Sequence, residues 1–401
     1  MDLADTKQFL SLLYERMCLV NPGIERLALY EFRYCLTNIT PVAGWKNIVI
    51  RPTQEVEAQI SDLAFFKSIQ FKPVRDGKIV LDDQIMTLTQ MLLAGLVHGD
   101  YSIEWLNTHF YFDIRAFVFL VRTPYYNQQI FDHFGGKPCF QFEQRQSSLA
   151  ALQDLGYREF SLANQQIDTA LIQTLEALIG QQGTPLILTL VGPTGAGKTE
   201  IIQRMRGALQ HKGLQVGSIE MDNFYKDGSF REGKPLDKHL IHYEIFLQSM
   251  QAIRAGKEAL IPRYNFLTTT SSHDLNSQLR AGQEPLLIQP ADVIFLEGNY
   301  PFHQPDVAPL VGTKIVYLTD DAMRLQRKWR RDIDYRKKYD PVYFVNRYFR
   351  TQFIRAAEVY RPLMQACDIL VDTSQAALWL TPALQTLVLP SLNEKQGAVH
   401  A

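Results

Sequence analysis

The sequence predicts an α/β fold in its second half, with a parallel sheet, a phosphate-binding loop and a helical lid, preceded by a separate α+β domain. Three observations support this prediction. An apolar run ends in a glycine-rich loop that leads into a helix-like segment, and later apolar runs end in acidic residues or lead into helices. A chain of 401 residues is also too long for one ordinary core.

The first 160 residues predict an α+β domain of unknown role. Phe9–Met17 and Glu55–Ile69 have helical patterns, whereas Leu27–Leu36 and Phe110–Val121 favour strands. The acid pair at 82–83, within residues 77–87, is similar to ribose-phosphate sites of phosphoribosyltransferases, but the phosphate-binding glycines are absent and an ordinary strand end is the alternative. Residues 30–33 and 101–106 show a diffuse resemblance to the N-terminal part of nicotinate phosphoribosyltransferases. This resemblance does not include any catalytic residue.

A connector helix is predicted over residues 161–184. Ile167, Leu171, Leu175 and Leu178 lie on one face at helical spacing, and the Gly-Thr-Pro sequence at 183–185 ends the helix. The second domain is predicted over residues 185–390, and the polar residues 391–401 are expected to be a frayed tail.

The glycine-rich loop follows the apolar run Leu186–Val191 and precedes a helix-like segment at 200–209. In such loops the backbone N–H groups and the helix N-terminus bind an anion. Lys198 can reach the β- and γ-phosphates, and Thr199 can ligate Mg²⁺. A nucleoside triphosphate is therefore predicted to bind at Gly192, Pro193, Thr194, Gly195, Ala196, Gly197, Lys198 and Thr199.

Two acids follow predicted strands of the same sheet. Asp222 ends a short strand and can accept a proton from an attacking hydroxyl or help to hold Mg²⁺; a turn or helix-capping role is the alternative. Glu297 ends the strand at 290–298, where a second magnesium carboxylate is expected. A third strand, 313–318, leads into an arginine-rich helix, which is either a solvated face or a lid that neutralises charge during phosphoryl transfer.

The order of these motifs resembles the uridine kinase and phosphoribulokinase family over residues 185–375. Besides the loop, the resemblance rests on residues 221–226, 255–257, 261–266, 290–298, 327–332, 360–362 and 366–371. It implies a P-loop kinase with a parallel sheet and a mobile helical lid. It also implies transfer of the γ-phosphate of ATP, with Mg²⁺, to a hydroxyl of a small metabolite, which in uridine kinases is the 5′ position of uridine or cytidine.

By this resemblance, Asp222 and Lys198 are catalytic residues, together with the lid residues Arg327, Arg331 and Arg336. Magnesium would be held by Thr199, Glu297 and Asp222. The substrate would be bound by Tyr225, Asp237, Tyr264 and Phe266, with Asp237 holding ribose hydroxyls and the last two bordering the base.

Two departures from the family pattern concern the substrate. Residues 236–246 keep only one of the family's acids in place, and the histidine that contacts the base is missing after 264–266 unless His273 takes its role. His273 is otherwise a loop histidine. Loss of a buried contact to the base favours another nucleoside, a sugar or a different alcohol.

The motifs leave three hypotheses for the function of this protein. The leading hypothesis is a kinase of a uridine-like or cytidine-like nucleoside; the alternative within this class is a kinase of a sugar phosphate, pantothenate or a riboside vitamin. A nucleotide-binding switch or scaffold with weak ATPase activity is an alternative of another class.

Composition limits the remaining partners. A net charge of -1 argues against a broad nucleic-acid-binding surface, and no apolar run approaches the length of a membrane span. Four cysteines far apart suggest neither a zinc site nor a disulfide framework. We therefore expect a cytoplasmic protein with a small-molecule substrate and neither nucleic-acid nor membrane partners, and a homo-oligomer is left open.

Overall fold

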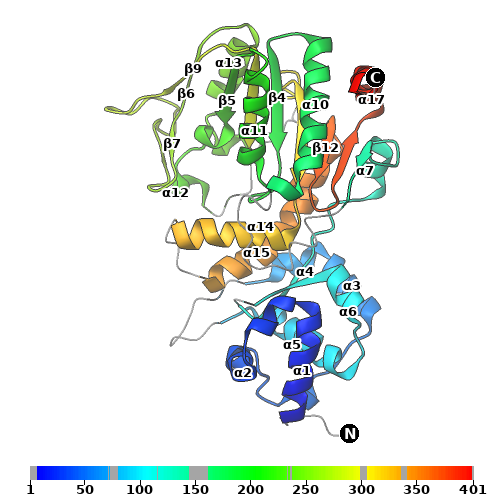
Figure 1. The fold of residues 1–401 in the computed structure, drawn as a ribbon. Helices are drawn as coiled ribbons and strands as arrows, with labels where there is room; N and C mark the ends of the chain where they lie inside the picture. The colour runs from blue at the N-terminus through cyan, green and yellow to red at the C-terminus, as the bar shows by residue number, and fades with distance from the viewer. Residues whose placement is uncertain are drawn as a thin grey trace. The chain divides into compact units, whose positions relative to one another are not determined.

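The computed structural model describes residues 7–70, 72, 80–114, 116–143, 161–232, 234, 237–298, 305–335 and 341–399 (Figure 1). The chain divides into two compact units, each built from separate stretches. The first unit comprises Met1–Tyr125, Arg145–Ser161 and Asp321–Val359, and the second comprises Tyr126–Gln144, Leu162–Asp320 and Tyr360–Ala401. This division differs from the predicted boundaries, because the arginine-rich segment after residue 320 belongs to the same unit as the N-terminal region.

The second unit contains a mainly parallel sheet, as predicted. Within the described residues the sheet has seven strands in the order β3-β13-β12-β11-β4-β10-β5. The five strands from β12 to β5 are parallel, whereas β13 and β3 add antiparallel to one edge. The bounds are β3 Phe140–Gln141, β4 Leu186–Val191, β5 Val216–Glu220, β10 Val293–Gly298, β11 Thr313–Leu318, β12 Ile369–Asp372 and β13 Ala377–Leu380.

Helices α10, α11 and α17 pack with this sheet around one hydrophobic core (Figure 1). The helices of this unit are α7 Gln128–His133, α10 Gln165–Gln182, α11 Lys198–Gln210, α12 Gly228–Arg231, α13 Tyr243–Arg254, α16 Arg361–Met364 and α17 Pro382–Val399. All four predicted apolar residues of α10 are buried. The expected frayed tail is not observed up to Val399, because the backbone of α17 continues to that residue.

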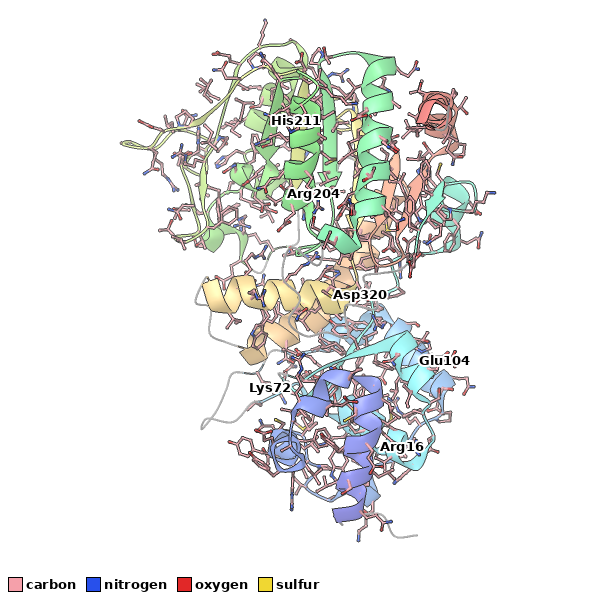
Figure 2. The ribbon with its side chains drawn as sticks, in the orientation of Figure 1. Arg16, Lys72, Glu104, Arg204, His211 and Asp320 are labelled. Atoms are coloured by element: carbon pink, nitrogen blue, oxygen red, sulfur yellow. The ribbon has the colours of Figure 1, made fainter. Side chains whose placement is uncertain are left out.

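Two small antiparallel pairs complete the second unit. They are β6 Ala259–Ile261 with β9 Leu286–Ile288, and β7 Tyr264–Asn265 with β8 Thr270–Ser271. An ion pair connects two of the long helices: Arg204 of α11 (Figure 2) lies 2.8 Å from the buried Asp168 carboxylate of α10. Tyr317 of β11 donates a hydrogen bond to the same carboxylate, so α10, α11 and the sheet are held together by polar contacts as well as by apolar packing.

The first unit is mostly helical around a hydrophobic core of its own. Within the described residues its α-helices and strands are α1 Lys7–Val20, α2 Leu29–Cys35, α3 Thr53–Ser61, α4 Leu63–Ser68, α5 Asp83–His98, α6 Ile103–His109, β1 Phe110–Asp113, β2 Val118–Val121, α14 Asp321–Trp329 and α15 Pro341–Arg355. A π-helical turn, Arg330–Tyr335, follows α14. Of the helices in the described residues, none combines the length and hydropathy needed to cross a membrane.

Three local predictions in this unit were wrong or incomplete. The predicted strand at 27–36 is mostly helix α2, since only Phe32 of that helix is buried and its alternation does not reflect a sheet. The predicted strand at 110–121 is a hairpin of β1 and β2. The predicted helix at 55–69 is broken at Asp62, which caps α4 by accepting a hydrogen bond from the Ala64 N–H.

Asp82 is a buried helix cap and not part of a ribose-phosphate site. Its carboxylate accepts hydrogen bonds from the backbone N–H groups of Gln84 and Gln70, at 2.9 and 2.7 Å. Both oxygens are thus engaged at the start of α5. Residues 77–79 of the suspected motif lie outside the described residues.

Candidate active site

The glycine-rich loop connects β4 to α11 and has the backbone geometry of an anion-binding turn. Gly195 and Gly197 adopt φ angles of 82° and 101°, which favour glycine, and Gly197 caps α11. A Cβ at Gly192 would lie 2.2 Å from the backbone oxygen of Tyr317, so no larger residue fits there. The loop therefore needs its glycines for two reasons, positive φ and close approach to β11.

Side chains donate hydrogen bonds to backbone carbonyl oxygens at both ends of this loop. The Lys198 ammonium donates to the carbonyl oxygens of Gly192 and Pro193, at 3.0 and 3.5 Å. At the end of β11, the buried Thr319 donates to the Ala196 carbonyl at 2.9 Å and lies 2.6 Å from the Thr373 hydroxyl. Sequence reasoning missed Thr319, although its position at the carboxyl end of a predicted strand was a usable signal.

Thr199 and Glu297 meet at the base of the loop, as the magnesium prediction requires. The Thr199 hydroxyl donates to the Glu297 carboxylate at 2.9 Å. The parallel register places Glu297 opposite Leu190 of β4 and Glu220 of β5. One hydroxyl and one carboxylate are therefore presented together at the carboxyl edge of the sheet, where ligands bind in such folds.

The electrostatics of Glu297 fit a divalent cation. Burial raises the pKa of Glu297, and the negative charges of Glu220 and Asp222 raise it further, whereas Lys198 and the Thr199 hydrogen bond lower it. The carboxylates of Glu220 and Asp222 thus repel the Glu297 carboxylate, and the Lys198 ammonium attracts it. The described residues contain no cluster of three or more metal-ligating side chains, but Mg²⁺ usually takes only one or two carboxylates together with substrate phosphates. Thr199 and Glu297 therefore suit Mg²⁺.

Asp222 lies directly after β5, in the short 3-10 helix Met221–Phe224. It is half-buried and close enough to Glu297 to raise the pKa of that residue. Gly298 allows the close packing behind it, because a Cβ there would lie 2.5 Å from the Met221 Cβ. The structure thus brings together the predicted catalytic acid and the predicted magnesium residues.

An aromatic cluster follows the segment of Asp222 and consists of Tyr225, Tyr264 and Phe266. The ring centroids of Tyr225 and Tyr264 lie 6.0 Å apart, and those of Tyr264 and Phe266 lie 5.1 Å apart. The Tyr264 N–H donates to the Asn223 side chain at 3.1 Å, which ties β7 to the segment of Asp222. The predicted substrate aromatics are therefore brought together.

Arg231 covers this cluster, and sequence reasoning missed it. Its guanidinium carbon lies 4.2 Å from the Tyr225 ring centroid. Its Nη2 donates to the Tyr264 hydroxyl at 2.5 Å, and its Nε donates to the Lys226 carbonyl at 2.8 Å. An arginine stacked on a tyrosine is a cation–π contact, which a sequence pattern alone does not reveal.

Asp237 has a local role in the structure. It is exposed, and its carboxylate accepts a hydrogen bond from the His239 N–H at 2.9 Å, which caps the short helix Lys238–Leu240. Binding of substrate hydroxyls by Asp237 stays a prediction.

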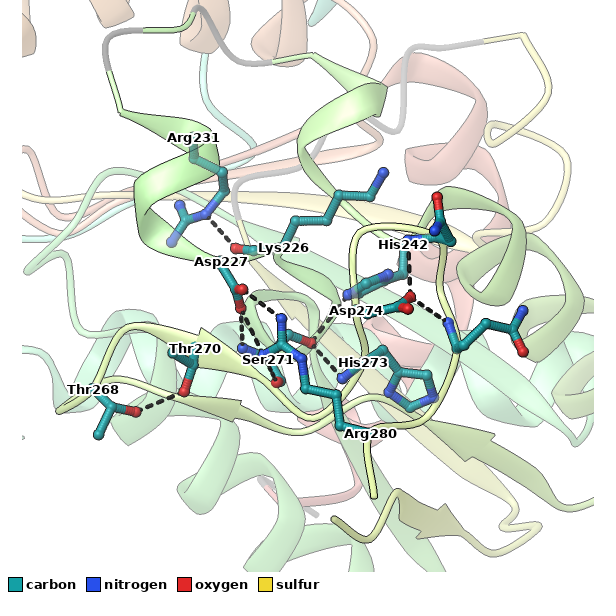
Figure 3. Close-up of polar contacts among 12 residues, drawn as sticks. Lys226, Asp227, Arg231, His242, Thr268, Thr270, Ser271, His273, Asp274 and Arg280 are labelled. Carbon is teal, nitrogen blue, oxygen red and sulfur yellow. Dashed lines mark hydrogen bonds and ion pairs between the residues drawn. The ribbon is translucent and has the colours of Figure 1, made fainter. Parts of the chain in front are cut away.

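A polar cluster holds the β7–β8 hairpin and the following loop (Figure 3). Asp227 pairs with Arg280 at 2.5 Å and accepts from the Ser271 N–H at 2.8 Å. The Arg280 hydrogen bond lowers the pKa of Asp227. His242 is buried, with its Nε2 3.0 Å from the Ser271 hydroxyl and its Nδ1 2.9 Å from the Ser277 hydroxyl.

His273 belongs to this cluster as well. It is buried, its Nδ1 lies 2.9 Å from the Ser272 hydroxyl, and its ring centroid lies 5.6 Å from that of His242. A role for His273 in place of the missing base-contacting histidine remains a prediction.

The buried His242 predicts a loss of stability in mild acid. Burial, together with the positive charges of the nearby His273 and Lys226, lowers the pKa of His242 from an ordinary value of 6.5 to about 4. Above pH 6.5 both folded and unfolded chains keep this group neutral. As the pH falls from there towards 4, only the unfolded chain takes up the proton. The free energy of unfolding should therefore fall by up to about 3 kcal/mol.

Urea unfolding at a series of pH values checks this prediction. His242→Gln should flatten the pH dependence over that window, whereas His211→Gln, at an exposed histidine after α11, should leave it as in the wild type. An equal slope in all three proteins would contradict the assignment to His242.

The predicted lid residues lie in the first unit. Arg327 is on α14, and Arg331 is in the π-helical turn, where its Nε lies 3.1 Å from the Asp332 carboxylate. Burial, together with the positive charges of Arg347, Arg331 and Arg355, lowers the pKa of Lys328 to about 8, and the Asp332 carboxylate opposes this shift. Arg336 lies outside the described residues. The lid segment thus concentrates positive charge, and its part in phosphoryl transfer stays a prediction.

Comparison with known proteins supports the motif analysis. Residues 187–376 match the model of the phosphoribulokinase / uridine kinase family. A segment of 159 residues is 30% identical to uridine-cytidine kinase A of Dictyostelium discoideum, covering 38% of this chain but only 29% of that relative. A segment of 226 residues is 26% identical to a uridine kinase of Lactobacillus helveticus, covering 53% of this chain and 99% of that relative.

A solved structure of D-glycerate 3-kinase from Cryptococcus neoformans aligns with 52% of this chain and 96% of its own, at 13% identity and a TM-score of 0.38.

Proposed function

Since residues 187–376 match the phosphoribulokinase / uridine kinase family, as the motifs predicted, we propose that this protein transfers the γ-phosphate of ATP to a hydroxyl of a small molecule. The observation that carries this proposal is the contact of Thr199 with Glu297 at the base of the glycine loop, with Asp222 in the electrostatic environment of the same carboxylate. A nucleotide switch would not need an acid on a segment that contacts a cluster of aromatic side chains.

In this proposal the residues of the site bind the phosphates, orient the acceptor hydroxyl or hold the metal ion. The N–H groups of the loop and Lys198 bind the β- and γ-phosphates, and Asp222 orients the acceptor hydroxyl and takes its proton. Thr199 and Glu297 would hold Mg²⁺, which neutralises phosphate charge when bound. Arg327 and Arg331 would stabilise the charge that develops on the transferring group.

We propose a nucleoside with a pyrimidine-like base as the leading acceptor. Tyr264 and Phe266 lie edge to face and offer a wall on which a flat base can rest. Relatives named as uridine-cytidine kinase and uridine kinase, 26–30% identical to this chain over the matched segments, support this choice.

A second candidate is an acceptor that carries a negative charge, such as a sugar phosphate or pantothenate. Arg231 and Lys226 are both half-buried near Tyr225. In the described part of the chain, their observed contacts are with aromatic rings, a carbonyl oxygen and a phenol, and not with a carboxylate. A half-buried cation without a carboxylate favours an anionic ligand.

Arg231→Met distinguishes the two acceptors. If the acceptor is anionic, loss of a charged hydrogen bond should raise the KM for the acceptor about ten- to a hundredfold, with the KM for ATP unchanged. If the acceptor is a neutral nucleoside, this KM should change by less than about threefold. Lys257→Met, which removes an exposed cation after α13, is the matched control and should change neither constant.

The proposed function is tested by ATP consumption with Mg²⁺ against ribonucleosides, riboside vitamins, sugars, sugar phosphates and pantothenate, with products identified by mass. Formation of one phosphorylated product from one acceptor would support a kinase and name its substrate. Slow hydrolysis that is indifferent to every acceptor would contradict the proposal and favour the switch or scaffold.

A further inference from the structure

The helices that follow residue 320 are part of the hydrophobic core of the N-terminal unit. Apolar residues of α14 and α15 are buried in the same cluster as those of α1–α6. Phe66 of α4 and Phe353 of α15 form a close aromatic contact, with stacked rings whose centroids lie 3.5 Å apart. Phe66 also lies 5.7 Å from Phe349 on the same helix. These helices are therefore packed as elements of the N-terminal fold.

A buried polar network fixes the start of α14. Arg324 is fully buried and forms an ion pair with Asp321 at 2.8 Å. Its guanidinium also donates to the Tyr125 hydroxyl and to the Gln352 side chain of α15. The Asp321 carboxylate further accepts from the Thr123 N–H at 2.7 Å. Arg324 therefore has a structural role, although its spacing resembled that of the lid arginines.

Two further contacts join the far end of the segment to α4. Arg350 donates to the Ile69 carbonyl at 3.3 Å, and Lys67 forms an ion pair with Glu358 at 2.8 Å. The second pair is about half exposed and contributes little by itself. Together with the core, these contacts attach the segment to the N-terminal region at both ends.

The position of Arg327 and Arg331 follows from this packing. Arg327 is one turn beyond Arg324 on α14, and Arg331 follows in the π-helical turn. A helix of nine residues has marginal stability in water without tertiary contacts. The core and the Arg324 network of the N-terminal unit supply such tertiary contacts to α14.

We propose that the N-terminal region serves phosphoryl transfer by holding the arginine-bearing helix α14, with Tyr125 and Phe66 as positioning residues for Arg327 and Arg331. This inference rests on the proposed function and on the predicted role of these arginines. It assigns a task to the first 125 residues, for which no sequence motif gave a role.

Two variants of the full chain test the proposal. Tyr125→Phe removes a hydroxyl that contacts Arg324, and Phe66→Leu removes the ring stacked on Phe353. Each should lower kcat about tenfold or more while the KM for ATP stays within about twofold, since the loop residues are untouched. Tyr34→Phe is the matched control, because Tyr34 is 77% exposed in the same unit.

Hydrogen exchange provides a readout that does not depend on activity. In both variants the amides of residues 321–329 should exchange about tenfold faster, whereas those of β4 and α11 should exchange as in the wild type. Faster exchange with an unchanged kcat would overturn the positioning role, and unchanged exchange would overturn the anchoring itself.

A wild-type chain that shows no transfer to any acceptor would refute the proposed function and, with it, the catalytic part of the inference. In that case the exchange data would still decide whether the N-terminal core holds α14. If one variant does not fold, the other variant decides between these outcomes, because the two changes affect different contacts.

Discussion

Asp222→Asn is expected to lower the rate of phosphoryl transfer at least about a hundredfold and to leave ATP binding nearly intact. Asparagine keeps the size of the side chain but cannot accept the proton of the acceptor hydroxyl. Asp222 also lies in the electrostatic environment of Glu297, so the change removes one negative charge there and lowers the pKa of Glu297 slightly. The measurements are kcat with saturating substrates and the Kd for ATP.

Glu232→Gln is a suitable control for this variant. Glu232 is an exposed acid on the same stretch of chain, so its replacement removes the same charge without touching the proposed acceptor position. Turnover close to that of the wild type in Asp222→Asn would remove Asp222 from its assigned role. Equal losses in both variants would show that the effect reflects net charge and not proton transfer.

The sequence predicted the part of the second unit around the glycine-rich loop because its signals are local. An apolar run, glycines and a lysine within fifteen consecutive residues determine a strand, a turn with positive φ and a helix N-terminus. Glu297 was located in the same way, since the carboxyl ends of parallel strands share one edge. The contact of Thr199 with Glu297 then follows from the parallel register of β4 and β10.

The features that the sequence did not predict depend on contacts between residues far apart in the chain, and the spacing of residues in a sequence does not reveal such contacts. Arg324, Arg327 and Arg331 share a helical period, yet only the structure shows that the first is buried beside Tyr125. The stacking of Arg231 on Tyr225 likewise depends on how α12 folds back. The predicted strand at 27–36 was wrong because alternation in a short segment also fits a helix with one buried side.

The proposed acceptor region combines partly exposed side chains with a hairpin that polar contacts hold in place, which bears on substrate choice. Arg231, Tyr225 and Phe266 are half-buried or exposed, whereas the hairpin behind them is held by Asp227, Arg280, Ser271 and His242. Proteins that share a backbone fold can bind different substrates when the side chains at the site differ between them. If the acceptor is anionic, we therefore expect substitutions at Arg231 to weaken its binding, whereas substitutions at Asp227 should reduce stability with either acceptor.

Gly192→Ala is expected to destabilise the second unit by about 3 kcal/mol or more and to abolish ATP binding. A Cβ at this position would lie 2.2 Å from the Tyr317 backbone oxygen. That oxygen belongs to a buried central strand of the sheet, so the strain cannot be relieved by moving a flexible side chain. The loop would have to move away from β11 and would lose the hydrogen bond from Thr319 to Ala196.

Gly207→Ala provides the matched comparison within the next helix. No atom lies within 4 Å of a Cβ built at Gly207 in α11, so alanine should stabilise the helix by about 0.5–1 kcal/mol through its higher helix propensity. The urea midpoints of the two variants should therefore shift in opposite directions from the wild type. A Gly192→Ala protein with wild-type stability and ATP affinity would show that the loop does not require its close approach to β11.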